Sequence, residues 1–210
     1  MGLRLTRRCI LGLTLASPAM AQRLAPVGIE ASGLLEPLRA GGLVLFFRHA
    51  DTQGEPCDRS FRLGDRAGQR NIAPRGREQS RRIAQRMAEL GIPVEFPVLA
   101  GPVYRARDTA EEAWGPARVR VTESLLADDF SGARLDWVLA EHRRLFTAPV
   151  SPGVNRVLVG HRTPAIMIFG DPVAGRAFPE GAALVIQPGV MRVLGVAEFA
   201  PLPGGGFHGC

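Results

Sequence analysis

Five consecutive apolar residues, 43–47, run directly into Arg48, His49 and Ala50. A short run without a polar position is typical of a β-strand that is buried on both faces. In α/β proteins, such strands end at the edge of the sheet where ligands bind. Arg48 and His49 would therefore bring a fixed positive charge and an imidazole to a ligand site, an arrangement suited to phosphate. A strand end that is merely basic is the simpler alternative.

Three later segments also carry polar or basic residues at positions where ligands bind in α/β proteins. Each such residue lies at the end of an apolar run or at the start of a helix. The segments are residues 71–79, 101–111 and 157–161. The second of them follows apolar residues 98–100 and places Arg105 at the start of a helix. The third is another apolar run, and it ends in His161. Two expected strands that both end in histidine argue against a coincidental placement of His49.

In this order, the four segments resemble the histidine phosphatase superfamily, also called the phosphoglycerate-mutase-like superfamily. The resemblance spans about residues 42–199. Expected strands and helices alternate, which by itself predicts an α/β sandwich with a mostly parallel sheet. The resemblance implies the three-layer α/β/α form. It also implies a phosphatase that hydrolyses a phosphomonoester or a phosphohistidine without a metal or other cofactor. The expected partner is a small phosphorylated substrate or a phosphoprotein.

The hydrophobic pattern gives the expected elements. Helices are predicted at residues 74–90, 105–114, 132–146 and 163–169, with a helical turn at 34–39. Strands are predicted at residues 43–47, 98–100, 119–121 and 157–159, and a terminal hairpin at 183–187 and 191–199. Residues 50–72 lack apolar periodicity. We expect them to form a loop draped over the site, with a disordered insert as the alternative.

The resemblance implies a phosphate pocket built from Arg48, His49, Arg105 and His161. His49 would be the nucleophile and form a phosphohistidine intermediate, which water then hydrolyses. A histidine attacks phosphorus only while its ring is neutral, and nearby arginines disfavour the charged form. The two guanidinium groups would clamp phosphate oxygens, and His161 would donate a further hydrogen bond.

A proton donor for the leaving oxygen is also needed. The superfamily commonly places a carboxylate after the helix of the second arginine and the strand that follows it, which favours Glu123. Asp128, Asp129 and Glu180 are rival candidates. Whichever carboxylate serves would need a raised pKa to hold its proton. A surface acid with no role is an equally simple interpretation of Glu123.

Two further residues are expected to contact the substrate. Asn71 lies in the second of the four segments. Arg162 follows His161, where the family more usually has a small or amide residue, so it could add recognition of charge or point to solvent. His142 is expected on the solvated face of its helix, and neither it nor His208 has a context that suggests a site.

Residues 1–21 have the layout of a secretory signal peptide. Three arginines and no acidic residue accompany an apolar stretch at residues 10–16, and a small-x-small site at 19–21 precedes Gln22. The stretch is too short to span a bilayer. Arg7 and Arg8 fit a twin-arginine signal, with an ordinary Sec signal as the alternative. We therefore expect export to the periplasm and a single mature domain, residues 22–210, without a membrane span.

The formal net charge of the whole chain is +6. It falls to +3, with 23 basic and 20 acidic residues, once the three arginines of the signal are removed. A mild positive charge suits small anionic substrates, and no basic run interleaved with aromatic residues suggests nucleic acid. Cys57 and Cys210 could form a disulfide in an oxidising compartment or remain free thiols. No cysteine or histidine spacing indicates a metal site.

Other functions remain compatible with these residues. A non-catalytic periplasmic protein that binds phosphate or another anion could use the same arginines without a working donor. A metal-dependent hydrolase is a third, weaker alternative. A mutase fits less well, because export removes it from glycolytic intermediates and the chain is short for that branch. The oligomeric state is left open.

Overall fold

The computed structural model describes residues 22–53 and 57–204. The predicted signal peptide, residues 1–21, and Cys210 lie outside this part of the chain. Cys57 is disulfide-bonded, and its pairing with Cys210 stays a prediction. In the described part, no helix combines the length and the apolar character needed to cross a membrane.

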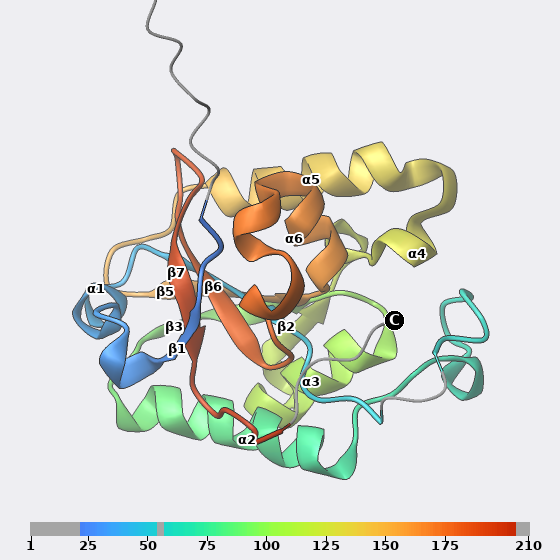
Figure 1. The fold of residues 1–210 in the computed structure, drawn as a ribbon, viewed down its shortest axis with the longest axis horizontal. Helices are drawn as coiled ribbons and strands as arrows, with labels where there is room; N and C mark the ends of the chain where they lie inside the picture. The colour runs from blue at the N-terminus through green and yellow to red at the C-terminus, as the bar shows by residue number, and fades with distance from the viewer. Residues whose placement is uncertain (1–21, 54–56, 205–210) are drawn as a thin grey trace, which may run out of the picture.

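The described residues form one seven-stranded sheet at the centre of the molecule (Figure 1). The strands are β1 (Pro26–Gly28), β2 (Val44–Arg48), β3 (Val94–Ala100), β4 (Val119–Val121), β5 (Asn155–Gly160), β6 (Ala182–Gln187) and β7 (Arg192–Glu198). Their order is β1-β7-β6-β2-β5-β3-β4. β6 runs antiparallel to β2 and β7, and the other neighbouring strands are parallel. The mostly parallel sheet expected from the sequence is confirmed.

Helices cover both faces of the sheet, which gives the three-layer α/β/α arrangement (Figure 1). They are α1 (Leu35–Ala40), α2 (Pro74–Glu89), α3 (Tyr104–Trp114), α4 (Asp128–Ser131), α5 (Leu135–Thr147) and α6 (Arg162–Phe169). α2 and α3 pack on one face, and α5 and α6 pack on the other. The expected fold class is therefore confirmed.

The central strand β2 explains why its sequence lacks polar positions. Val44 and Phe46 belong to the core under α5 and α6, whereas Leu45 and Phe47 belong to the core under α2 and α3. Successive side chains of a strand point to opposite faces, and here both faces are covered. Burial on both faces explains why the run has no polar position. The run ends at Arg48, the last residue of the strand.

Helix α2 begins and ends where its sequence predicts. Pro74 opens it, because the missing N–H of proline costs nothing in the first turn. Gly91, which follows the helix, has a φ of 67°, a conformation that glycine adopts most readily. Within α2, a side chain at Gly76 would meet the carbonyl oxygen of Asp51 at 2.0 Å. Glycine at this position lets the helix approach the segment that follows His49.

Three local expectations differ from the structure. β1 and α4 form in segments where the sequence predicts no element. His142 is fully buried, not solvated as expected. It shares the buried side of α5 with Val138, Leu145 and Phe146, at the i, i+4, i+7, i+8 spacing of one helix face.

Candidate active site

The register of two parallel strands brings His49 and His161 together. β2 and β5 pair so that Arg48 lies opposite Gly160, and the His49 N–H donates to the Gly160 carbonyl at 3.0 Å. Each histidine directly follows its strand, so both rings reach the same edge of the sheet. The ring centroids are 5.5 Å apart. One tetrahedral group can contact both rings at this spacing.

The hydrogen bonding of His49 assigns the tautomer of its ring. Nδ1 lies 2.9 Å from the carbonyl oxygen of Ala50, and a carbonyl only accepts, so Nδ1 carries the hydrogen. The lone pair of a neutral ring is then on Nε2. Burial, followed by the charges of Arg48 and Arg105, holds the pKa of His49 well below its usual value. His49 is therefore a neutral imidazole with a nucleophilic Nε2 at ordinary pH.

His161 has a similar environment. It is almost fully buried, and burial together with the nearby Arg105 charge lowers its pKa well below the usual value. Its Nε2 is buried and has no hydrogen-bond partner among the described residues. A buried polar atom left without a partner carries a free-energy cost, and a ligand in the pocket would relieve it.

Arg48 and Arg105 bring two guanidinium groups to these rings. Arg48 is buried and donates to the Phe178 carbonyl and to Glu180, both at 3.1 Å. Burial lowers its pKa to about 9, and the Glu180 charge opposes this effect. Arg105 lies in the first turn of α3 and donates from Nη1 to Asp58 at 3.0 Å. Burial also lowers the pKa of Arg105, against the charge of Asp58.

These groups line a small pocket with a cavity volume of about 30 Å³. Its lining consists of Arg48, His49, Arg105, Ala127, Asp128, Asp129, His161, Arg162 and Thr163. Pockets for drug-sized ligands are roughly ten times larger. The volume therefore suits a group of a few atoms, with the rest of any ligand outside.

A carboxylic acid lies in the same pocket. Asp128 is the first residue of α4, and burial raises its pKa, helped by the negative charge of Asp129. A raised pKa allows a carboxyl group to keep its proton at higher pH, as a general acid requires. Asp128 was one of the rival candidates for the proton donor, and it lines the same pocket as Arg48, His49, Arg105 and His161.

Glu123 is not brought to this pocket. Its side chain is 52% exposed and forms a 2.6 Å ion pair with Arg134. Glu123 begins the short 3₁₀ turn Glu123–Leu125, and the chain reaches the pocket only after that turn, at Asp128. Glu123, which the sequence favoured as the proton donor, does not line the pocket, whereas Asp128 and Asp129 do.

The two expected substrate contacts separate in the structure. Arg162 lines the pocket. Asn71 instead donates from its amide to the carbonyls of Arg66 and Gln69, at 3.0 and 2.8 Å. It lines a separate hollow formed by the loop before α2. Asn71 therefore holds the loop together and does not line the phosphate-sized pocket.

Glu180 serves as a shared acceptor behind the pocket. Its buried carboxylate accepts from Arg48 and from both the backbone N–H and the hydroxyl of Thr52. Arg70, which the sequence analysis did not single out, lies 3.8 Å from the same carboxylate and is also buried. Glu180 thus holds arginines in place, and it does not line the cavity.

Asp58 is a second contact that the sequence did not indicate. Its side chain is 8% exposed, and its carboxylate holds Arg105. It also accepts from the backbone N–H of Arg70 at 2.7 Å. The loop before α2 is therefore attached to the pocket, as expected for residues 50–72. Its contacts join residues 12 and 47 positions apart, which no local pattern reveals.

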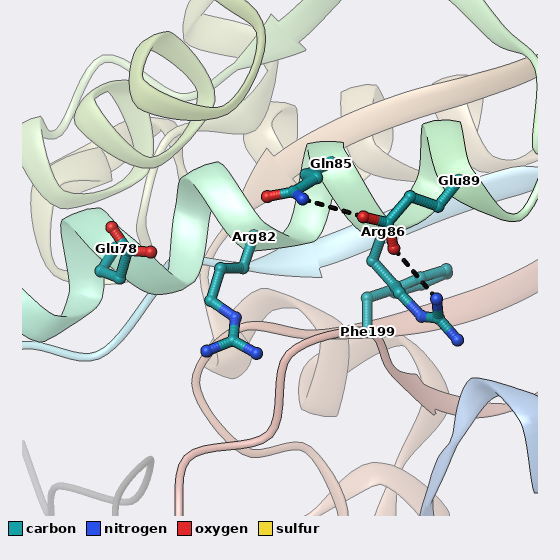
Figure 2. Close-up of a pocket in the computed structure, with 6 residues that line it drawn as sticks. All are labelled: Glu78, Arg82, Gln85, Arg86, Glu89 and Phe199. Carbon is teal, nitrogen blue, oxygen red and sulfur yellow. Dashed lines mark hydrogen bonds and ion pairs between the residues drawn. The ribbon is translucent and has the colours of Figure 1, made fainter.

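A larger hollow lies on the surface of α2 (Figure 2). Its volume is about 260 Å³, and it is lined by Glu78, Arg82, Gln85, Arg86, Glu89 and Phe199. Figure 2 shows Glu89 accepting from both Gln85 and Arg86. Arg86 also pairs with Glu30, and Glu78 pairs with Arg81. The hollow thus carries exposed surface charges and no histidine or cysteine. Among the described residues, no cluster of His, Cys, Asp and Glu side chains could hold a metal ion.

No family model matches the chain, and no curated protein matches it. Solved structures do. A protein histidine phosphatase, SixA, complexed with tungstate is 17% identical, with a TM-score of 0.46, over 74% of this chain and 92% of that chain. An alpha-ribazole phosphatase from Shigella flexneri is 14% identical, with a TM-score of 0.44, over 74% of this chain and 94% of that chain.

A mycobacterial glucosyl-3-phosphoglycerate phosphatase is 19% identical, with a TM-score of 0.42, over 61% of this chain and 80% of that chain. Similarity at this level does not establish an activity, so the residues of the pocket must carry any functional assignment. These three solved structures are phosphatases of the histidine phosphatase superfamily, the family that the four sequence segments of this chain resemble.

Proposed function

We propose that the protein is a metal-independent phosphatase that hydrolyses a phosphomonoester or a phosphohistidine through a phosphohistidine intermediate on His49. The observation that carries this proposal is the convergence of two buried imidazoles, 5.5 Å apart, with two buried arginines. A neutral imidazole supplies a nucleophile for phosphorus, and guanidinium groups compensate the negative charge of the phosphoryl oxygens.

In the first step, Nε2 of His49 attacks phosphorus in line with the leaving oxygen. The new N–P bond forms as the P–O bond to the leaving group breaks. The leaving oxygen takes the proton of Asp128, whose pKa is raised by burial. Arg48 and Arg105 bind the phosphoryl oxygens throughout, and His161 donates from Nε2 when that atom carries the ring proton.

In the second step, a water molecule attacks the phosphohistidine from the side that the leaving group has vacated. Asp128, now a carboxylate, accepts a proton from this water. The N–P bond breaks, inorganic phosphate is released, and His49 returns to its neutral form. Arg162, at the same pocket, is the proposed further contact to the substrate.

The test offers purified mature protein a chromogenic aryl phosphate across acidic to neutral pH, with EDTA present. Turnover that is lost in His49→Ala supports the proposal. Binding of inorganic phosphate without turnover of aryl or alkyl esters would instead support the non-catalytic anion-binding protein. Turnover that EDTA abolishes and added metal restores would overturn the metal-independent mechanism.

The proposed site of action is the periplasm. The support is the signal-like composition of residues 1–21, which lie outside the described residues. Sequencing the N-terminus of protein recovered from the periplasmic fraction tests this proposal. A mature chain beginning at Gln22 is the expected result, and an uncleaved cytoplasmic chain would overturn it.

A further inference from the structure

The pocket is large enough for the phosphoryl group of an ester but not for its alcohol portion. A cavity of about 30 Å³ holds little more than the transferred group. The alcohol portion of an ester must then lie at the mouth of the pocket. The side chains that surround this mouth, beyond the charged residues that bind phosphate, decide which alcohols are accepted.

An aromatic pair begins beside Arg105, one of the residues that line the pocket. Phe130 belongs to α4, the helix whose first residues, Asp128 and Asp129, line the pocket. The Arg105 guanidinium carbon lies 5.9 Å from the centroid of the Phe130 ring. The Phe61 ring packs against Phe130 edge to face, with centroids 5.6 Å apart and an interplanar angle of 70°. Aromatic surface therefore begins next to the guanidinium that would hold the phosphate.

Phe61 remains half exposed although it packs against Phe130. The residue is 54% exposed, and its loop has several fixed contacts. Asp58 binds Arg105 at 3.0 Å, and Arg66 donates to both carboxylate oxygens of Asp108, at 2.6 and 2.8 Å. The ring thus packs against Phe130, the neighbour of Arg105, with about half of its surface in water. An apolar group that extends from the pocket over this ring would remove that surface from water.

We propose that Phe61 and Phe130 form a leaving-group subsite that selects phosphate esters of apolar alcohols, with aromatic alcohols preferred. The inference rests on the proposed function, because it names the substrate class of the same pocket. Phe61 supplies the exposed contact surface, and Phe130 joins it to Arg105 by packing against both.

The test compares ethyl, butyl, hexyl and 2-phenylethyl phosphate, since these primary alcohols are similar as leaving groups and differ mainly in apolar surface. For the wild type, kcat/KM is expected to rise along the series and to be highest for the phenylethyl ester. Phe61→Ala should lower the ratio of phenylethyl to ethyl kcat/KM roughly three- to tenfold, mainly through KM. Phe61→Tyr should keep the ratio.

Phe96→Ala is the matched control. Phe96 is 46% exposed and has an arginine, Arg118, 5.1 Å from its ring centroid, but it lies on β3 and lines a different hollow. Its substitution should leave the ratio unchanged. An unchanged ratio in Phe61→Ala, or an equal fall in both alanine variants, would overturn the subsite.

A binding measurement separates this inference from the proposed function. Calorimetry with 2-phenylethylphosphonate and ethylphosphonate requires no turnover. If no ester is hydrolysed but the phenylethyl compound binds more tightly, and Phe61→Ala removes the difference, then the subsite stands and the proposed function fails. If turnover depends on His49 but neither esters nor phosphonates show an apolar preference, then the subsite fails and the proposed function stands.

Discussion

Two buried histidines of this protein share their local chemistry and differ in their surroundings. His49 donates from Nδ1 to the Ala50 carbonyl at 2.9 Å, and the Nδ1 atom of His142 lies 2.8 Å from the Val138 carbonyl. Burial is the main cause that lowers the pKa of each ring. Around His49, however, lie Arg48, Arg105 and a second histidine, whereas around His142 lie phenyl rings.

The difference separates a ring packed in the core from a ring that faces a pocket. The rings of Phe46 and Phe146 lie 6.0 and 5.9 Å from that of His142, so the region around His142 is packed core. At His49, charged groups converge on a cavity from β2, α3, α4 and α6. We therefore assign the phosphoryl chemistry to the pocket and a packing role to His142.

The largest effect is expected from removing the nucleophile. His49→Ala should lower kcat/KM for an aryl phosphate by about 10⁴-fold or more, because it removes the proposed nucleophile. Steady-state kinetics measures the loss, and circular dichroism verifies the fold. Residual activity within tenfold of the wild type would mean that His49 is not the nucleophile and does not differ from His142 in this respect.

A smaller loss is expected when the geometry of a clamp residue changes but its charge stays. Arg105→Lys keeps a cation beside Asp58 and loses the planar fork that matches phosphate oxygens. We expect kcat/KM to fall roughly 100-fold. Alanine would be a poorer choice, because it leaves the Asp58 carboxylate buried without its partner. A lysine variant with wild-type activity would mean that charge alone matters.

The dependence of stability on acidic pH tests the role of the second histidine, His142. Burial lowers the pKa of His142 to about 4, so between pH 6.5 and 4 the unfolded chain binds a proton that the folded chain does not. Stability is therefore lost as pH falls through this window, by about 3 kcal/mol at pH 4.

Replacing the His142 ring should remove its share of this loss, while the buried rings of His49 and His161 keep theirs. For His142→Phe, the free energy of unfolding from urea titrations should depend less on pH between 6.5 and 4 than that of the wild type. Activity at pH 7 should stay within about twofold of the wild type, because the ring lies in the core. A large loss of activity in a folded variant would place His142 in the catalytic machinery.

The acid role of Asp128 in the first step should matter only for poor leaving groups. In single-turnover experiments, which separate this step from hydrolysis of the intermediate, Asp128→Asn should slow phosphohistidine formation about 10- to 100-fold for an alkyl phosphate and much less for a nitrophenyl phosphate, whose leaving oxygen needs no proton. In the wild type, alkyl-ester turnover should fall as pH rises through the raised pKa of Asp128. This decline should be absent in Asp128→Asn, and equal losses on both esters would argue against the role.

The smallest effect is expected outside both regions. Arg82 lines the exposed hollow on α2 (Figure 2), and surface charges contribute little to stability. Arg82→Ala should therefore change kcat/KM less than twofold and the free energy of unfolding by less than about 0.5 kcal/mol. A large effect on phosphate binding would indicate that phosphate binds at this surface and not in the pocket.

The sequence predicted those parts of the site that strands and helix starts carry. His49 and His161 directly follow apolar runs, and Arg105 opens a helix after a third one. Parallel strands end at the same edge of a sheet, so these residues had to approach one another. The fold class followed from the same alternation of strands and helices.

Contacts made by loops and turns could not be predicted in this way. The pairing of Asp58 with Arg105 and of Glu180 with Arg48 joins residues 47 and 132 positions apart. The choice between Glu123 and Asp128 depended on one short turn. The burial of His142, in contrast, could have been predicted from its helical spacing to Val138 and Phe146. The charged residues next to it in the sequence led to the wrong expectation of a solvated face.

Trapping the intermediate tests the central claim most directly. Wild-type protein is mixed with a phosphorus-labelled aryl phosphate and quenched in base, in which phosphohistidine survives, and the labelled peptide is sequenced. We expect the label on His49, with none retained by His49→Ala. Rapid turnover with the label on another residue, or recovered only as free phosphate, would contradict the account.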